Sequence, residues 1–152
     1  GNHYALAMVD VDHFKSINDQ YGHDLGDQVL RAIAAQLRRV SGGGRAYRFG
    51  GEEFCLLFRG KTREQVVDYL EQLRKNIANY DMATRDKKNR PRYQSSGEKK
   101  RGASRRRGNI RVTVSIGVAD AQDALHFDGV MKAADSAMYR AKEAGRNQTK
   151  IA

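Results

Sequence analysis

The stretch Arg48-Phe49-Gly50-Gly51-Glu52-Glu53-Phe54 decides the fold, because it places two glycines between two apolar, strand-like runs. A Gly-Gly pair between strands predicts a tight hairpin, since both turn positions accept positive φ without a Cβ clash. The bare backbone of such a turn also leaves room for a ligand. Glu52 and Glu53 point to opposite sides if a strand begins there. The hairpin tip is therefore a candidate site for a metal and a phosphate, and a solvated surface hairpin is the alternative reading.

A second stretch, Leu6-Ala7-Met8-Val9-Asp10-Val11-Asp12, is an apolar run that ends in two carboxylates two residues apart. A run without alternation predicts a strand that is covered on both faces. Asp10 and Asp12 would then project to the same face, where water, a donor or a cation must offset their repulsion. The alternative is that both carboxylates cap the helix that follows.

Together the two stretches resemble the GGDEF family, the diguanylate cyclases. The segment 9–27 follows the family pattern almost position by position, and residues 48–54 are the signature in its Glu variant. Two later blocks, 112–118 and 134–147, match the C-terminal motifs of the family. The resemblance runs from about Tyr4 to Ile151 and is interrupted by one basic insertion.

The chain has 152 residues, which suits one domain with a sizeable core. We expect residues 1–152 to form a single GGDEF catalytic domain without the sensor region, because the block and helix that precede the first core strand in the family are missing. There is no long apolar segment, so we expect a cytoplasmic domain whose core makes no membrane contact, although the parent protein could be anchored. The single cysteine, Cys55, is expected to be a small core side chain in a reduced compartment.

The net charge of +10 is concentrated in one segment. Residues 85–107 hold eleven Lys or Arg against Asp86 and Glu98, a local excess of +9, so the rest of the chain is nearly neutral. We interpret residues 79–109 as an inserted basic loop or extended hairpin, since this polar stretch buries too little apolar surface to offset its ordering entropy. The basic run 85–107 has one aromatic, Tyr93, and lacks the stacking array of single-strand binders, so no nucleic-acid partner is expected.

Hydrophobic periodicity predicts the remaining elements. Helices are expected over residues 13–21, from 24 to about 40, from 62 onward with a Thr62–Gln65 capping box, and over 127–144. Strands are expected over 45–49, 54–58, 110–118 and 148–151. This order predicts an α+β fold with a mostly antiparallel central sheet of about five strands plus the hairpin, covered by helices. The ferredoxin-like palm of nucleotide cyclases, implied by the resemblance, agrees with it.

The resemblance also implies the chemistry: condensation of two GTP molecules into cyclic di-GMP and two pyrophosphates, by attack of a ribose 3′-hydroxyl on an α-phosphate. Oxygen ligands and a triphosphate imply Mg²⁺, with Mn²⁺ as a substitute. By match to the motif, Asp10, the Val11 carbonyl and Glu52 would hold the metal, and Glu52 is the candidate proton acceptor. For Glu53, metal contact and a solvated or supporting role stay open.

The substrate positions also come from the match. Asn18 and Asp27 would read guanine, because they offer the acceptors that its N1 and N2 donors need, and His23 would contact the substrate beside them. His23 could equally be a helix-cap or core histidine. The phosphates would be held by the set His13 and Phe14 (backbone N–H), Lys15, Lys142 and Arg146, with Gly51 leaving room for the substrate.

The resemblance implies a two-fold homodimer, since one domain carries one GTP site. It also implies that an inhibitory product site is absent, because Ser41 and Gly44 replace the Arg and Asp of its Arg-x-x-Asp motif. Two other functions are considered: a non-catalytic nucleotide-binding module, and nucleic-acid binding through residues 85–107. The intact signature favours the enzyme.

Overall fold

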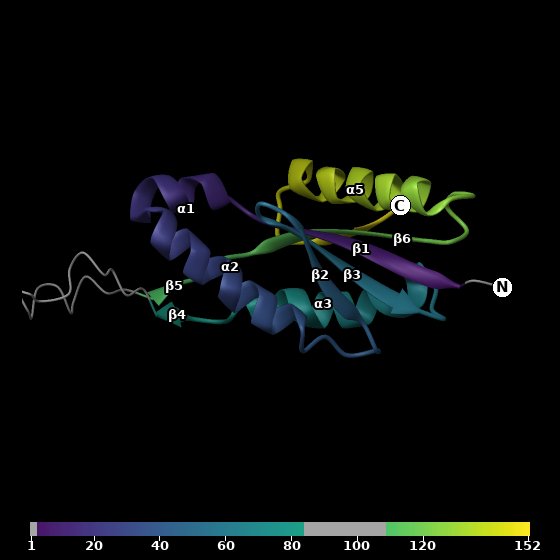
Figure 1. Ribbon diagram of the computed structural model, residues 1–152, viewed down its shortest axis with the longest axis horizontal. Coiled ribbons are helices and arrows are strands. Elements are labelled where there is room, and N and C mark those ends of the chain that lie inside the picture. The colour runs from purple at the N-terminus through teal and green to yellow at the C-terminus, as the bar shows by residue number, and fades with distance from the viewer. Residues whose placement is uncertain (1–2, 84–108) are drawn as a thin grey trace, which may run out of the picture.

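The apolar run that ends in Asp10 forms the middle strand of the central sheet. The computed structural model describes residues 3–83 and 109–152. In chain order the described elements are β1 (Tyr4–Val11), α1 (Phe14–Tyr21), α2 (His23–Leu37), β2 (Arg45–Gly50), β3 (Glu53–Arg59), α3 (Arg63–Ala78), β4 (Met82–Ala83), β5 (Asn109–Ile110), β6 (Val114–Asp120), α5 (Phe127–Glu143) and β7 (Thr149–Ile151), as Figure 1 shows.

The main sheet has five strands in the order β2-β3-β1-β6-β7. All neighbouring pairs are antiparallel except β6 and β7, which run parallel. The predicted α+β class and the mostly antiparallel sheet are therefore confirmed. The hairpin, β2 with β3, is counted within the five strands and does not add to them.

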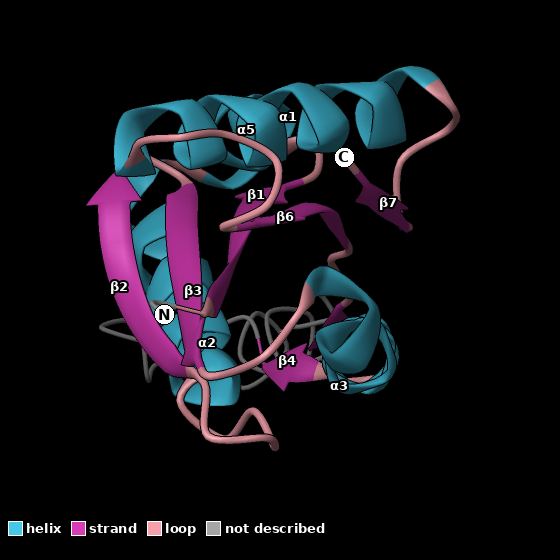
Figure 2. Cartoon of the chain, turned by 90° about the vertical axis from the view of Figure 1, so that its right-hand side faces the viewer, coloured by secondary structure: helices cyan, strands magenta, loops and turns pink. Residues whose placement is uncertain are grey.

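Helices cover both faces of this sheet (Figures 1 and 2). Helix α5 lies on one face, and α2 and α3 lie on the other, while α1 continues from the end of β1. Alternate side chains of β1 pack into the two hydrophobic clusters on either side of the sheet. Ala5, Ala7 and Val9 belong to the cluster with α2 and α3, whereas Leu6 and Met8 belong to the cluster with α5. A strand without polar alternation is thus buried on both sides, as predicted.

Local signals in the sequence set several helix ends. Helix α3 begins with the predicted capping box, in which the Thr62 hydroxyl accepts from Gln65 N at 3.2 Å and Thr62 N donates to Gln65 Oε1 at 2.8 Å. Gly22, with φ +90°, follows α1, and Gly145, with φ +118°, follows α5, as their positions predicted. None of the helices in residues 3–83 and 109–152 is both long and apolar enough to cross a membrane.

The strand predicted over residues 110–118 is wrong in its extent. Asn109–Ile110 forms β5 and pairs with β4 in a separate two-stranded sheet, and β6 begins only at Val114. The break follows from the neighbour, because Val11 pairs with Val114 and β1 ends there. Before Val114 the chain no longer pairs with β1, and Asn109–Ile110 pairs with β4 instead. Every residue of β6 is buried, including those that alternation placed on a polar face.

The segment predicted over residues 79–109 as a basic loop or extended hairpin has short paired strands at its two ends. Met82 is buried in the main core and Ile110 packs against it, and their two short strands pair antiparallel. The ends of the predicted insertion therefore belong to the fold. The basic run 85–107 itself lies outside the described residues.

Cys55 lies on β3 and is buried, as predicted, in the cluster beneath α5. Burial raises the pKa of its thiol to about 11. The thiolate is the reactive form, so this side chain behaves as a small core residue.

Candidate functional site

The end of β1 carries the buried carboxylate of the candidate site. Asp10 is only 3% exposed, and its Oδ2 accepts a hydrogen bond from Lys142 Nζ on α5. Its Oδ1 is buried and has no partner among the described residues. Burial raises the pKa of the Asp10 carboxyl, and the Lys142 ammonium opposes that rise. A desolvated carboxylate oxygen with a free lone pair is a ligand position for a cation.

The hairpin tip lies beside this carboxylate. Glu53, the first residue of β3, pairs directly with Asp10, and the Glu52 carbonyl accepts from Val11 N at 3.3 Å. Both glutamates are partly exposed. Burial and the neighbouring Asp10 raise the pKa of Glu53. The tip thus brings two carboxylates to the end of β1, as the sequence predicted.

The turn differs in detail from the predicted Gly-Gly turn. Gly51 takes a positive φ of +44° and Gly50 does not, and the register shifts between Arg48 and Gly50. The Arg48 guanidinium donates to the Gly51 carbonyl at 2.7 Å, which braces the turn. This brace could not be read from the glycine pair alone. No atom lies within 4 Å of a Cβ built on either glycine, so the backbone at the tip is open.

A divalent cation fits the donors gathered here. In the described ranges no group of three or more His, Cys, Asp or Glu side chains forms a metal cage. Mg²⁺ does not require one, because it is commonly held by one or two carboxylates together with substrate phosphates. The buried, unpartnered Asp10 Oδ1 next to the hairpin carboxylates meets that description.

The start of α1 presents backbone donors at the same end of the molecule. His13 caps the helix in the left-handed conformation, with φ +56°, and its side chain is exposed. Within the described chain, neither the His13 nor the Phe14 amide donates to an acceptor. Lys15 is exposed, whereas the Phe14 ring is buried. Free amides at a helix N-terminus beside a lysine are suited to an anion.

The predicted guanine-binding residues, Asn18 and Asp27, lie on α1 and α2, which follow each other directly in the chain and pack together. Asn18 Oδ1 is buried without a hydrogen-bond partner in the described part of the chain. It lies where a side chain on Gly26 would be, 1.8 Å from an ideal Cβ. Asp27 follows Gly26 and is exposed, as is His23 at the start of α2. An exposed His23 is not the core histidine that the sequence left open.

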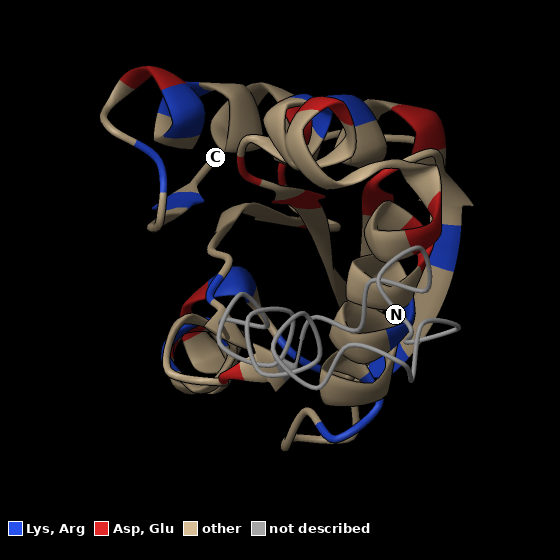
Figure 3. Cartoon of the chain, turned by 90° about the vertical axis from the view of Figure 1, so that its left-hand side faces the viewer, with Lys and Arg blue, Asp and Glu red and all other residues tan. Residues whose placement is uncertain are grey.

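The two predicted phosphate cations lie at the C-terminal end of α5. Lys142 contacts Asp10, and the exposed Arg146 follows α5 in the turn to β7. Arg146 and Asn147 both have positive φ, +64° and +50°. Figure 3 looks onto this end of the molecule and shows both acidic and basic positions on it.

Hydrogen-bond donors offset the charge of the buried Asp12, and its alternative reading as a cap of α1 is not observed. Asp12 is 3% exposed, and its carboxylate accepts from Thr113 Oγ1 and Ser115 Oγ, both at 2.6 Å, and from Asn147 N at 3.0 Å. Its partners therefore lie on β6 and in the α5–β7 turn, not in α1, so it does not cap that helix. The sequence draws attention to Asp12 as the second carboxylate of the Asp-x-Asp pair. It does not reveal the hydrogen-bond partners of Asp12, because they lie more than 100 positions away along the chain.

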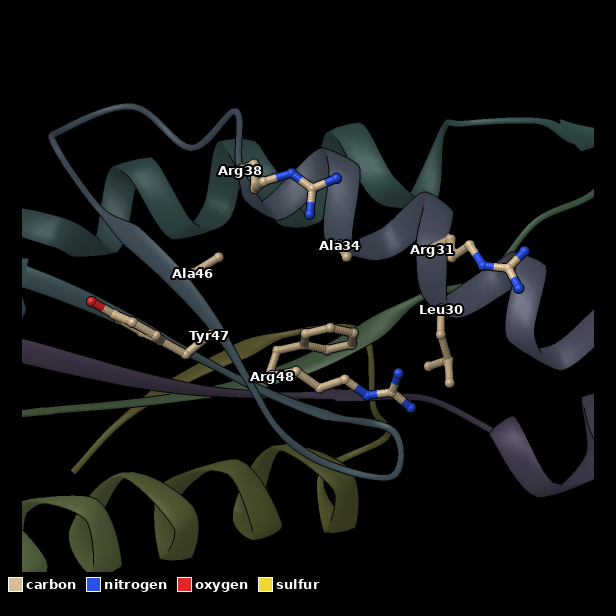
Figure 4. Close-up of a pocket in the computed structure, with 8 residues that line it drawn as sticks. Leu30, Arg31, Ala34, Arg38, Ala46, Tyr47 and Arg48 are labelled. Atoms are coloured by element: carbon tan, nitrogen blue, oxygen red, sulfur yellow. The ribbon is translucent and has the colours of Figure 1, made fainter.

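A separate cavity of about 240 Å³ lies between α2 and β2 (Figure 4). Three arginines line it, Arg31 from α2, Arg38 directly after α2 and Arg48 from β2, around a largely apolar lining that includes Leu30 and Ala34. In residues 3–83 and 109–152 none of the three pairs with a carboxylate. Arg31 lies one helical turn beyond Asp27, so it is on the α2 face that carries the predicted guanine position.

Comparison with known proteins agrees with this arrangement. Residues 1–148 match the family model of the diguanylate cyclase GGDEF domain. Over 149 residues the chain is 35% identical to the diguanylate cyclase VdcA of Vibrio cholerae, covering 97% of this chain and 39% of that protein. It is also 35% identical over 153 residues to DgcP of Pseudomonas aeruginosa, covering 100% of this chain and 20% of that protein. The chain thus spans well under half the length of these curated relatives.

Solved structures give the same result. The GGDEF domain of DgcB from Caulobacter crescentus, in complex with c-di-GMP, superposes with a TM-score of 0.80 at 31% identity, covering 99% of this chain and 78% of that one. The active GGEEF domain of a diguanylate cyclase from Vibrio cholerae superposes with a TM-score of 0.73 at 28% identity, covering 98% and 82%. The chain therefore belongs to the GGDEF domain family of diguanylate cyclases.

Proposed function

We propose that this domain condenses two molecules of GTP into cyclic di-GMP and two pyrophosphates, as a metal-dependent homodimer. The observation that carries the proposal is the buried, unpartnered Asp10 Oδ1 at the end of β1, next to the open hairpin tip. Leaving a buried carboxylate oxygen without a partner is costly, and a bound cation removes that cost.

Asp10, the Val11 carbonyl and Glu52 would hold Mg²⁺, or Mn²⁺ in its place, with Glu53 beside them. The bound ion would neutralise triphosphate charge and orient the α-phosphate for attack. Glu52 would accept the proton of the attacking 3′-hydroxyl, directly or through a hydroxyl beside it. Glu53 pairs with Asp10 across the strands, so its side chain would lie on the same face, where it could contact the ion or support the ligands.

The substrate would lie between α1, α2 and the end of α5. Asn18 and Asp27 would accept from the guanine N1 and N2 donors, and His23 lies exposed at the same corner. This pairing favours GTP over ATP, because adenine would leave the carboxylate unpaired. The His13 and Phe14 amides, Lys15, Lys142 and Arg146 would bind the β- and γ-phosphates, and the bare backbone at Gly51 would allow their approach.

One domain with one GTP site can supply only half of the reaction, so the catalytic species would be a two-fold pair of domains. Each partner would present its bound GTP to the other, with the 3′-hydroxyl of one nucleotide facing the α-phosphate of the other. The relatives are named diguanylate cyclases, and the DgcB domain was solved with c-di-GMP. These names support the substrate class proposed here.

The test is incubation of the protein with GTP and Mg²⁺, followed by chromatographic separation of the nucleotides. Wild type should form cyclic di-GMP, and Glu52→Gln should form none while keeping the wild-type melting temperature. Glu143→Gln, an exposed glutamate on α5, is the matched control and should remain active. GTP binding without any product from wild type would instead favour the non-catalytic nucleotide-binding module.

A further inference from the structure

The turn between α5 and β7 carries Arg146 in a backbone conformation that its own sequence does not favour. Arg146 and Asn147 are consecutive non-glycine residues with φ +64° and +50°. L-residues rarely adopt this region in succession, because Cβ then approaches the following carbonyl oxygen. Such a turn persists only when contacts from the surrounding structure hold it.

The carboxylate of Asp12 reaches this turn from the core, and the Arg74 guanidinium on α3 also contacts it by donating to Asn147 Oδ1 at 2.7 Å. Asp12 Oδ2 accepts from Asn147 N at 3.0 Å and from Thr113 Oγ1 at 2.6 Å, while Oδ1 accepts from Ser115 Oγ at 2.6 Å. The Asp12 amide also donates to the Thr113 carbonyl at 2.9 Å. The side chain is buried, so all its bonds form away from solvent screening.

Asp12 therefore joins three segments at one point. It lies two residues after Asp10, it is anchored on β6, and it holds the amide next to Arg146. The donors are two hydroxyls and one backbone N–H, none of them a cation. Asp12 thus links the turn that carries Arg146 to β6 and to the end of the segment that carries Asp10.

We propose that Asp12 is a positioning residue that holds the Arg146–Asn147 turn in its phosphate-binding arrangement. The inference rests on the proposed role of Arg146 in binding the triphosphate. It assigns to the second carboxylate of the Asp-x-Asp pair a function separate from that of the first. Asp10 would face the metal, whereas Asp12 would act through Arg146.

The test measures the affinity of the intact protein for a non-hydrolysable GTP analogue by calorimetry. Arg146→Ala should weaken binding about fivefold or more, as expected for the loss of a charge-assisted hydrogen bond. Asp12→Ala should weaken it to a similar extent, and the double variant Asp12→Ala/Arg146→Ala should be no weaker than Arg146→Ala alone. Such non-additivity is the signature of two residues that act through one contact.

A conservative variant separates geometry from charge. Asp12→Asn can place its carbonyl oxygen toward Asn147 N and Thr113, and donate its NH₂ to the Ser115 hydroxyl, which rotates to accept. It should keep near wild-type affinity. Hydrogen exchange gives a second readout: Asp12→Ala should lose protection at the Asn147 amide and retain it along β1. If Asp12→Ala does not fold, Asp12→Ser, whose short hydroxyl does not reach Asn147, carries the same test.

Val130→Ala, a buried truncation at the other end of α5, controls for lost stability and should bind the analogue as wild type does. Unchanged affinity in Asp12→Ala, additive losses in the double variant, or an Asp12→Asn variant as weak as Asp12→Ala would each overturn the positioning role alone. Unchanged affinity in Arg146→Ala would overturn the phosphate assignment, and the inference with it.

Discussion

Asn18 occupies the space where Gly26 has no side chain, and this pair offers a test at the scale of single residues. An ideal Cβ on Gly26 would lie 1.8 Å from Asn18 Oδ1, 3.0 Å from its Cγ and 3.2 Å from Phe14 Cζ. The obstructing atom is the end of a side chain, so Asn18 can swing away at little cost. A methyl group on Gly26 would therefore displace the Asn18 amide that we propose binds guanine, and would leave the fold intact.

We expect Gly26→Ala to keep or slightly raise stability, since alanine is favoured over glycine within a helix by about 1 kcal/mol. Binding of a GTP analogue should nonetheless weaken by about 1–3 kcal/mol, the usual cost of a lost buried hydrogen bond. Calorimetry and thermal unfolding on the same samples separate the two effects. Adding Gly26→Ala to Asn18→Ala should have no further effect on affinity, and an additive loss would mean that Gly26 acts by another route.

The individual residues also show which parts of the candidate site can be predicted from the sequence and which require the folded structure. The motif match proposes Asp10 and Glu52 as metal ligands, and the structure brings the end of β1 and the hairpin tip together. Asp12 was placed beside Asp10 correctly, but its role depends on Thr113, Ser115 and Asn147, which only the folded chain brings together. The Arg48 brace on Gly51 was missed for a similar reason, because it needs the shifted register of the hairpin.

At the scale of elements, α5 rests directly on the backbone of β6 at Gly117. A Cβ there would lie 2.1 Å from Ala134 O and Met138 N, both of which are backbone atoms of α5. A helix backbone cannot move aside as a side chain can, so the whole helix would have to shift away from the sheet. This close approach positions the end of α5 that carries Lys142.

Gly117→Ala should therefore destabilise the protein by about 1–3 kcal/mol or more, as overpacking of a core does. Urea unfolding of the variant measures this loss. Gly50→Ala is the matched control, since its Cβ would meet no atom within 4 Å and its φ is not positive. Equal stability of the two variants would show that α5 adjusts to the added methyl group without cost.

A second element-scale contact ties α3 to β7 through Glu71. Its carboxylate accepts from Arg74 Nε at 2.7 Å and Nη2 at 2.9 Å, and from Thr149 Oγ1 at 2.7 Å. The hydrogen bonds with Arg74 lower the pKa of Glu71, although partial burial opposes them. A carboxyl group with a depressed folded-state pKa stabilises the fold above its unfolded value and loses that contribution as pH falls.

Glu71→Gln should then lower the melting temperature at pH 7 by a small amount, because the pair is partly exposed and such pairs contribute about 1 kcal/mol or less. The difference from wild type should shrink as pH falls from about 5 toward 3, where the wild-type carboxyl takes up its proton. Thermal unfolding across this range measures it. A difference that stays constant with pH would mean that shape, and not the charge of Glu71, stabilises this junction.

At the scale of the whole molecule, the features that depend on residues close in the sequence were predicted correctly, and one that depends on distant strand pairing was not. The Thr62–Gln65 capping box, the helix ends at Gly22 and Gly145 and the doubly buried β1 were all confirmed, because each depends on a few neighbouring residues. The extent of β6 was not predicted correctly, because it depends on where β1 stops pairing and on Asn109–Ile110 pairing with β4.

The loop before β2 determines whether the domain has the family's site for inhibition by its product. The Arg-x-x-Asp inhibitory motif of the family would fall on Ser41 and Gly44. A Cβ on Gly44 would lie 2.5 Å from Phe58 Cε2 and 2.8 Å from Val40 Cγ1. The loop is therefore packed against the core at the position where an aspartate would be required.

We expect cyclic di-GMP at micromolar concentration to leave the initial rate nearly unchanged, since a hydroxyl and a hydrogen atom supply neither the cationic fork nor the acceptor that guanine and phosphate need. Restoring the motif with Ser41→Arg/Gly44→Asp should not create inhibition, because the new carboxylate would have to displace the fully buried Phe58 ring; it should lower stability instead. Pyrophosphate release across a product titration measures the rates.

Strong inhibition of wild type that Arg38→Ala relieves would mean that the arginine-lined cavity between α2 and β2 binds the product in place of the missing motif. Inhibition gained by the double variant would show that the Phe58 ring gives way, so that the packing of this loop does not exclude product control.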